Sequence, residues 1–172
     1  NPPYVCGRNM DENTKVKTKR YKVCDSGSTD LYIPFFQIAI EMLKDNGILG
    51  YITMNSFLKS LNARKSREYF MDSHYEISII DFRGHQVFKG KSTYTCLFFL
   101  DKKSSDVLHY CYNGNAKLNS QLQFTDILYS SLDADKGWNL NENGLANKIE
   151  SVGIPLFKYC QTRHGIATLS NK

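Results

Sequence analysis

Residues 30–53, DLYIPFFQIAIEMLKDNGILGYIT, contain a helix pattern that runs directly into a strand pattern. Asp30 is a suitable N-cap, Pro34 is tolerated because it lies near the first turn, and Gly47 stands where a helix C-cap belongs. The run 48–53 is short and apolar and predicts a strand. Apolar residues recurring at helical spacing predict one buried face, made of Leu31, Phe35, Ile38, Ala39, Met42 and Leu43.

The alternation continues toward the C-terminus. Ser56 is a suitable cap for a second helix that runs to about Met71, and its apolar residues are Phe57, Leu58, Leu61 and Phe70. YEISIIDF (75–82) and YTCLFFLD (94–101) predict two more buried strands, and RGHQVFKGKST between them fits a hairpin at a sheet edge. Helices that alternate with strands predict an α/β sheet with helices on its faces.

The flanks of this region are less regular. Residues 5–29 are polar, are expected to form a loop, and carry the basic run KVKTKRYK. Beyond 102 the pattern loosens, although VLHYCY could form a strand and NENGLANKIESVG a short helix. We therefore expect a boundary near 102–105, with one domain over 1–102 and a second region over 103–172.

Composition is that of a globular protein with a mild basic excess. Of the 172 residues, 41% are hydrophobic and 23% charged, and the net charge is +5. This charge permits a polyanionic partner without requiring one. Five scattered cysteines without a CxxC pair predict reduced thiols rather than disulfides or zinc, and no histidine has a partner at metal-ligand spacing. With no apolar run near about 18 residues, we expect a cytoplasmic protein without membrane contact.

The tetrad Asn1-Pro2-Pro3-Tyr4 has a chemistry of its own. The exocyclic amine of a nucleobase is a poor nucleophile, because its lone pair is delocalised into the ring. The Asn1 side-chain oxygen and the Pro2 carbonyl could accept hydrogen bonds from the two N–H groups of such an amine. Two successive prolines restrict the backbone that carries the Pro2 carbonyl. Tyr4 offers a face for an extruded base, worth about 1–3 kcal/mol. Such a site acts through position and dipoles, and needs no metal. Alternatively, the tetrad is a simple turn.

Its context resembles a known family. NPPY, a variable loop and then DLYIPFFQIAIEMLKDNGILGYITMNSFL look like the amino-methyltransferase motif and the motifs that follow it in N6-adenine DNA methyltransferases. The match is to the gamma class, found in prokaryotic type IIG restriction–modification enzymes. VFKGKSTYTCLFFL is similar to the later motif that approaches the flipped adenine, and TRHGIATLSNK to the entry of a target-recognition domain. The resemblance is dense over 1–101 and thinner beyond.

The resemblance implies a role for each matching residue. Asn1 and Pro2 would accept from the adenine N6 amine, with Pro3 stiffening the tetrad and Tyr4 stacking on the base. Phe88 would contact the base from its other side or edge, and Phe35 could line the adenosine pocket of S-adenosylmethionine. Phe35 also lies on the predicted apolar face of its helix, where packing in the core is the commoner role. Phosphates of double-stranded DNA would meet cations of two segments, Lys89 and Lys91 in one and Lys15, Lys17, Lys19 and Arg20 in the other.

The resemblance also implies an incomplete cofactor site. The family binds S-adenosylmethionine mainly through an earlier strand, a glycine-rich turn and an acidic residue, and this sequence contains none of them. We therefore expect the second half of a Rossmann-like methyltransferase sheet, followed by the start of an α+β target-recognition region. Half a sheet exposes a strand edge, so the chain is expected to self-associate and to be inactive alone.

Two other functions remain open from the sequence. An NPPY site also serves methylation of a glutamine side-chain amide in proteins. A non-catalytic DNA-binding module could likewise retain the scaffold without the reaction. The basic loops and the C-terminal segment favour DNA as the substrate.

Overall fold

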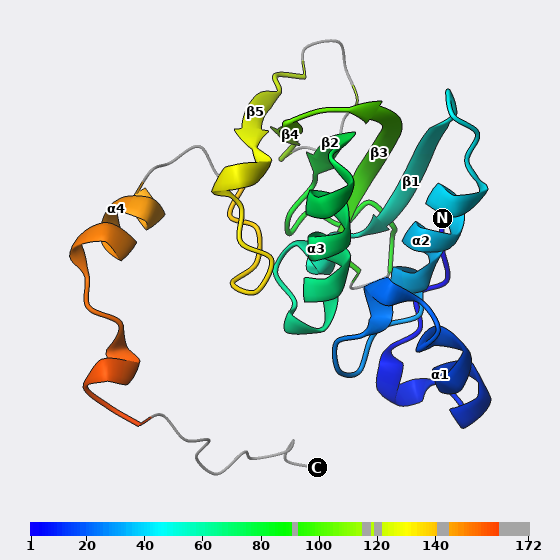
Figure 1. Ribbon diagram of the computed structural model, residues 1–172, viewed down its shortest axis with the longest axis horizontal. Helices are drawn as coiled ribbons and strands as arrows, with labels where there is room; N and C mark the ends of the chain where they lie inside the picture. The colour runs from blue at the N-terminus through cyan, green and yellow to red at the C-terminus, as the bar shows by residue number, and fades with distance from the viewer. Residues whose placement is uncertain (91–92, 115–117, 119–121, 141–144, 162–172) are drawn as a thin grey trace. The chain divides into compact units, whose positions relative to one another are not determined.

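The computed structural model describes residues 1–90, 93–114, 118, 122–140 and 145–161 (Figure 1). The chain divides into two compact units, 1–140 and 141–172. The first unit contains a five-stranded sheet and its core. In the second, the described residues form α4 (Leu145–Val152) and a 3-10 turn at Leu156–Lys158, and α4 confirms the short helix predicted there.

The sheet has the order β1-β3-β2-β4-β5. β3 is antiparallel to both β1 and β2, β2 is parallel to β4, and β5 closes the far side antiparallel to β4. The mixed α/β class and the four strands expected from the sequence are confirmed. The β2–β3 hairpin is also confirmed, but its predicted place at a sheet edge is wrong, because both strands have a neighbour on each side. The strands are β1 (Ile48–Met54), β2 (Tyr75–Asp81), β3 (Thr95–Ser104), β4 (Val107–Tyr112) and β5 (Thr125–Leu128).

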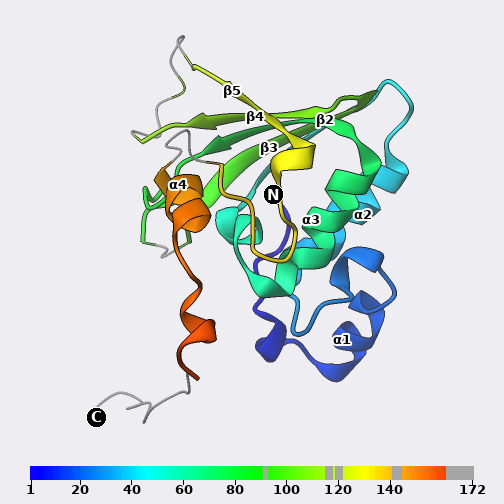
Figure 2. The ribbon, with the colours of Figure 1, turned by 60° about the vertical axis from the view of Figure 1, so that its left-hand side comes forward.

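Two helices pack on the same face of the sheet, α2 (Tyr32–Met42) and α3 (Arg64–Ser73). Figure 2 shows both helices on one side of the sheet. The Phe98 ring of β3 lies 4.9 Å from Phe36 of α2 and 5.3 Å from Phe70 of α3, centre to centre, so all three rings share one core. Trp138 closes this core 6.1 Å from Phe70 and is fully buried. Gly137 has a φ of +89°, and a Cβ there would lie 3.1 Å from the Lys59 Cα, so only glycine lets this segment approach so closely.

The buried face of α2 differs from the predicted one. Tyr32, Ile33, Phe36 and Ile40 are buried, whereas Met42 is 79% exposed. The helix is apolar on almost every side, so its periodicity does not select a face. Its ends also differ: the N-cap is Leu31 without a side-chain hydrogen bond, and the C-cap is Leu43. Gly47 closes a separate turn through a hydrogen bond from its N–H to the Lys44 carbonyl, and the Asp30 carboxylate accepts from Gly7 N instead.

Two other expectations about the helices were wrong. The second helix does not begin at Ser56; 3-10 turns occupy Asn55–Leu58 and Leu61–Ala63, and α3 follows. Its predicted core residues Phe57, Leu58 and Phe70 are buried, but Leu61 is 66% exposed. The expected loop 5–29 contains α1 (Glu12–Thr18), which the Asp11 side chain caps by accepting from Thr14 N at 3.0 Å.

The predicted boundary near 102–105 falls at the end of β3. β4 and β5 continue the same sheet, and the two compact units divide after Leu140. The segment around Trp138 belongs to the first unit, because Trp138 N donates to the Leu58 carbonyl at 2.7 Å and the ring fills the core. Assignment of residues 103–172 to a connector and a target-recognition region stays a prediction.

Candidate functional site

The NPPY tetrad lies against β1 and the start of α2. Asn1 and Pro3 are exposed, Pro2 is buried and Tyr4 is half-buried. The Tyr4 hydroxyl donates to the Ile52 carbonyl at 2.9 Å, and its ring meets the Tyr32 ring edge-on at 6.4 Å. Just beyond the tetrad, the Val5 carbonyl accepts from Leu31 N at 2.9 Å. Tyr4 is therefore fixed at both ring and hydroxyl.

Burial, with a smaller contribution from the nearby Cys96 thiol, raises the pKa of Tyr4 above its ordinary value. The phenol consequently stays neutral at physiological pH and keeps donating to Ile52. Asn1 is exposed, and the residue that follows it, Pro2, is buried. The tetrad thus presents an exposed amide side chain next to a proline, whose backbone is conformationally restricted.

Phe88 lies in the segment that leaves β2. Phe88 is half-buried, Lys89 is exposed, and Lys91 lies outside the described residues. The segment begins beside Asn55, directly after β1, because Asn55 Nδ2 donates to the Arg83 carbonyl at 3.2 Å. The structure thus brings the tetrad and this segment to the same half of β1, at Ile52 and at Asn55. Within the described residues, no ring contact joins Tyr4 to Phe88.

Phe35 lies on α2 away from the core. Its side chain is half-buried, and its backbone carbonyl accepts from the Tyr51 hydroxyl at 3.4 Å. The aromatic residue that fills the core is its neighbour Phe36, which is fully buried. Part of the Phe35 ring therefore remains available to a ligand or a partner.

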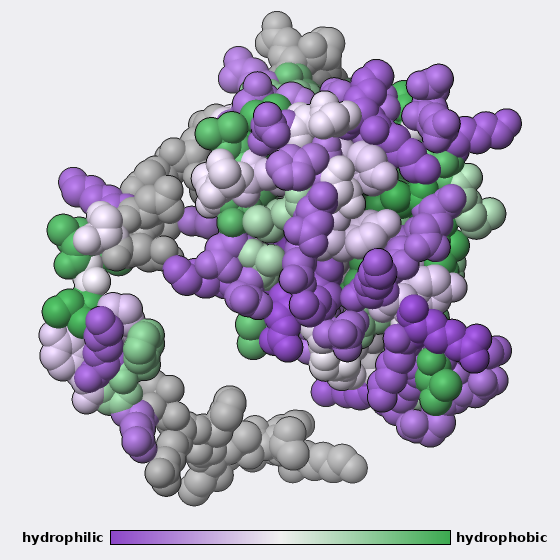
Figure 3. Space-filling model, viewed as in Figure 1, coloured by the Kyte–Doolittle hydropathy of each residue, from purple (hydrophilic) through white to green (hydrophobic). Residues whose placement is uncertain are grey.

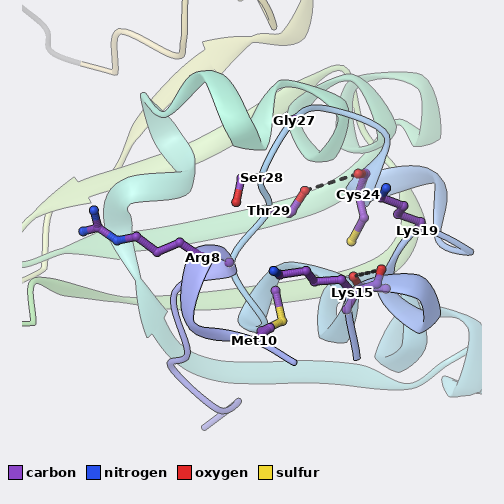
Figure 4. A pocket seen from close by; sticks show the side chains of 10 residues that line it. Arg8, Met10, Lys15, Lys19, Cys24, Gly27, Ser28 and Thr29 are labelled. Atoms are coloured by element: carbon purple, nitrogen blue, oxygen red, sulfur yellow. Dashed lines mark hydrogen bonds between the residues drawn. The ribbon is translucent and has the colours of Figure 1, made fainter. Parts of the chain in front are cut away.

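A cavity of about 330 Å³ opens between α1 and the loop 24–29 (Figure 4). Of the basic run, Lys15 and Lys19 line this cavity, whereas Lys17 and Arg20 do not. Lys15 Nζ lies 2.8 Å from Glu12 Oε1 in an exposed ion pair. Figure 3 shows hydrophilic residues gathered over α1. The full lining is Gly7, Arg8, Met10, Lys15, Thr18, Lys19, Cys24, Gly27, Ser28 and Thr29.

The cavity wall mixes apolar, hydroxyl and basic side chains, and none of its charged residues is buried. Figure 4 shows the Arg8 side chain extending away from the other lining residues, and the Thr29 hydroxyl donating to the Cys24 carbonyl at 3.2 Å. Burial raises the pKa of the Cys24 thiol to about 12, so it is neutral and does not repel an anion. The Thr18 and Thr29 hydroxyls both donate to backbone carbonyls, so the groups of the wall suited to a phosphate are the lysine cations and the Ser28 hydroxyl.

The sequence predictions missed several residues of the candidate site, among them Arg8, Ser28 and Asn55. Arg8 and Ser28 lie in the segment that was expected to be a loop, and their shared cavity depends on how that segment folds. Asn55 had a usable signal, because it is a polar residue directly after a predicted strand, and ligands of α/β sheets bind beyond the carboxyl ends of strands. In the described part of the chain, no group of three or more His, Cys, Asp or Glu side chains is arranged to hold a metal ion. No described helix is long and apolar enough to cross a membrane.

This arrangement of sheet and helices occurs in solved restriction-modification enzymes. The type IIG restriction endonuclease BpuSI matches 88% of the chain with a TM-score of 0.62 and 17% identity, over 22% of its own length. DrdV in its complex with DNA matches 80% of the chain with a TM-score of 0.58 and 17% identity, over 17% of its length. At these identities, the likeness concerns the fold.

Sequence comparison identifies the family. The family described as Eco57I restriction-modification methylase matches residues 1–88, and the chain belongs to it. The chain is similar to the Type II restriction enzyme and methyltransferase RM.Eco57I of Escherichia coli, with 38% identity over 186 aligned residues. That alignment includes 100% of this chain and 18% of RM.Eco57I. The chain thus spans less than a quarter of each of these proteins.

Proposed function

We propose that this chain is part of an S-adenosylmethionine-dependent DNA methyltransferase that modifies adenine at N6 in a restriction-modification system. Its part is to supply the pocket for the flipped adenine. The observation that carries the proposal is the NPPY tetrad in a restriction-modification methylase, with an exposed Asn1 on a buried Pro2 and Tyr4 fixed to β1. We also propose that the sheet is the second half of a Rossmann-like methyltransferase sheet.

In this proposal the tetrad orients the reacting amine. The Asn1 Oδ1 and the Pro2 carbonyl oxygen each accept a hydrogen bond from one N6–H group. The lone pair of the nitrogen then turns out of the ring plane toward the methyl donor. As the nitrogen becomes tetrahedral and positively charged, these two oxygens stabilise it more strongly than in the ground state. After the methyl group is transferred, the cationic N6 loses one of its two protons to solvent and becomes neutral again.

Two aromatic residues would hold the base. Tyr4 is suited to stacking because its hydroxyl is anchored at Ile52, so the ring orientation is fixed before the base arrives. Phe88 would contact the base from the other side or edge, and Phe35 would face the adenosine of the cofactor. Extrusion from the duplex is required, because the amine cannot react inside the base stack.

Basic residues at two places would hold the DNA backbone. Lys89 is exposed beside Phe88, and Lys15 and Lys19 line the α1 cavity with Arg8. The Lys15–Glu12 ion pair is exposed and therefore weak, so a phosphate would replace the Glu12 carboxylate as the partner of Lys15. Lys17, Arg20 and Lys91 remain proposed phosphate contacts outside the cavity.

The residues present do not form a complete S-adenosylmethionine site. The described cavity is lined by basic and hydroxyl side chains together with Met10, Cys24 and two glycines, and Phe35 is not among them. The sequence also lacks a glycine-rich strand-to-helix turn. We therefore assign to this chain the base pocket, and derive no step from the cofactor.

The test is methylation by the full-length enzyme on duplex DNA. Removing one oriented polar group from a transition-state site lowers kcat about 100-fold or more, and we expect this of Asn1→Ala. Asn9→Ala removes an exposed amide from the same segment and is expected to leave the rate unchanged. Full adenine methylation by Asn1→Ala would contradict the proposal.

The substrate class is tested in the same assay. Wild-type enzyme is supplied with labelled methyl donor and either duplex DNA or a glutamine-containing protein, and the product is identified as N6-methyladenine or N-methylglutamine. Label found in the protein alone would show that the enzyme methylates glutamine and not DNA. DNA binding with no label in either substrate would indicate a non-catalytic module.

A further inference from the structure

Asn55 connects both ends of the segment that carries Phe88. Its side-chain Nδ2 donates to the Arg83 carbonyl at 3.2 Å, where the chain leaves β2. Its backbone N–H donates to the Tyr94 carbonyl at 3.1 Å, where the chain enters β3. Asn55 itself directly follows β1, so three strands meet at this residue.

The second Nδ2 hydrogen bond of Asn55 goes to Asp81, the last residue of β2. Asp81 Oδ1 accepts it at 2.9 Å and also accepts from Arg83 N at 2.8 Å, and Asp81 Oδ2 accepts from the Tyr110 hydroxyl at 3.1 Å. Asp81 is 6% exposed and Tyr110 is 5% exposed. The carboxylate is thus buried, and the groups that satisfy it come from the turn after β1, from β4 and from the start of the Phe88 segment.

The geometry selects an amide at position 55. Both side-chain partners of Asn55 are acceptors, a carboxylate and a carbonyl, so only an NH₂ group satisfies them together. An aspartate there would set a second carboxylate against Asp81, and an alanine would leave both acceptors short of a donor. The arrangement is therefore specific for the residue and not only for its size.

Arg83 shows how tightly the start of the segment is held. Its φ is +47°, a left-handed conformation that a residue with a Cβ adopts only when its surroundings impose it. Its N–H is bonded to Asp81, its carbonyl to Asn55, and its guanidinium stacks 4.0 Å from the centre of the Tyr112 ring. The path of the chain after Arg83 is thereby fixed.

We propose that Asn55 is a positioning residue that fixes the segment 83–90 and so sets the place of Phe88. The consequence for the base pocket rests on the function proposed above, whereas the fixing of the segment does not. The amide acts through Arg83 and Asp81, and does not itself touch the base.

Hydrogen exchange of the backbone amides tests the fixing of the segment, in the chain as it exists and without DNA. Asn55→Ala is expected to speed exchange across 83–90 about tenfold. Ile77→Val is the matched control, because it weakens the core of β2 without contacting Asn55 or Asp81. Equal protection of 83–90 in Asn55→Ala and wild type would overturn the proposal.

Tyr110→Phe gives a second, gentler variant in case Asn55→Ala does not fold. It keeps the ring in the core and removes the hydroxyl that bonds to Asp81 and to the Arg83 side chain, so exchange across 83–90 is expected to rise a few-fold. Unchanged exchange in this variant would count against Asp81 as part of the anchor and, if Asn55→Ala does not fold, would overturn the proposal.

Fluorescence of 2-aminopurine at the target position tests the consequence in the full-length enzyme. Wild type is expected to raise this fluorescence on flipping the base, and Asn55→Ala to reduce the rise while lowering kcat more than it raises KM for DNA. Suppose that the amides of 83–90 exchange rapidly in Asn55→Ala while the 2-aminopurine fluorescence rise and kcat are those of the wild type. This result would overturn the link between the segment and the base pocket. No rise in the wild type would instead contradict the proposed function, and the exchange result would still decide the fixing.

Discussion

Arg67 is completely buried and makes its hydrogen bonds to backbone carbonyls. Its Nη1 donates to Phe57 O at 2.6 Å and to Ser60 O at 2.8 Å, and its Nε and Nη2 both donate to Ala134 O. One guanidinium therefore joins α3, the turn after β1 and the segment that leads to Trp138. The planar fork of arginine suits this task, because it directs donors to several acceptors at fixed angles.

Replacing Arg67 should destabilise the protein strongly. We expect Arg67→Leu to lower the free energy of unfolding by about 3 kcal/mol, because buried carbonyl groups lose charged donors. Arg67→Lys should not restore stability, since an ammonium cannot reach the three carbonyls together. The measurement is urea denaturation followed by circular dichroism.

The control for Arg67 lies on the same helix. Lys65 makes an exposed ion pair with Glu68 at 2.5 Å, and Lys65→Ala should leave the urea midpoint unchanged. An Arg67→Lys midpoint equal to that of the wild type would show that the charge alone, without the fork, accounts for stability.

At the scale of elements, the accuracy of the sequence predictions follows from how each element is encoded. β1, β2 and β3 were predicted correctly because each is a short apolar run bounded by polar residues. The face of α2 could not be predicted, since Phe35 and Phe36 are equally apolar and only tertiary packing separates them. α1 was missed although Asp11 and Thr14 form its cap, because its lysines suggested a loop.

The candidate site divides in the same way. Asn1 to Tyr4 form one contiguous motif, so the sequence alone suggests their chemistry. The Asn55–Asp81 contact joins residues 26 positions apart. It exists because β1 and β2 flank β3, both run antiparallel to it, and so end at the same edge of the sheet. No local pattern of residues contains that information.

The position of the basic residues around α1 predicts which of them contributes to DNA binding. Lys19 lines the cavity and Lys17, two residues before it, does not. If the cavity binds a DNA phosphate, Lys19→Ala should weaken duplex binding and reduce the slope of log Kd against log salt by about 1. Lys44→Ala is the control, because Lys44 is exposed and is not a proposed phosphate contact, and it should leave the slope unchanged. Fluorescence anisotropy over a salt series measures both, and equal effects of the two variants would contradict a phosphate in the cavity.

At the scale of the whole molecule, the sheet ends at β1. Among the described strands, β1 is bonded to β3 alone, and its first residue Ile48 is 69% exposed. The Tyr4 hydroxyl bonds to the Ile52 carbonyl, so the tetrad meets β1 at one point of its length. Since unpaired strand edges recruit further strands, this side of the molecule is suited to association.

We expect the chain to self-associate through the edge of β1. Sedimentation equilibrium should show a concentration-dependent dimer, and Ile48→Lys should weaken it about tenfold, because a charge on an edge strand opposes pairing with a second strand. Leu61→Lys is the matched control, since Leu61 is 66% exposed but lies in the Leu61–Ala63 turn, outside the sheet. A compact monomer at every concentration would contradict association through this edge, and equal weakening by both lysine variants would place the contact elsewhere on the surface.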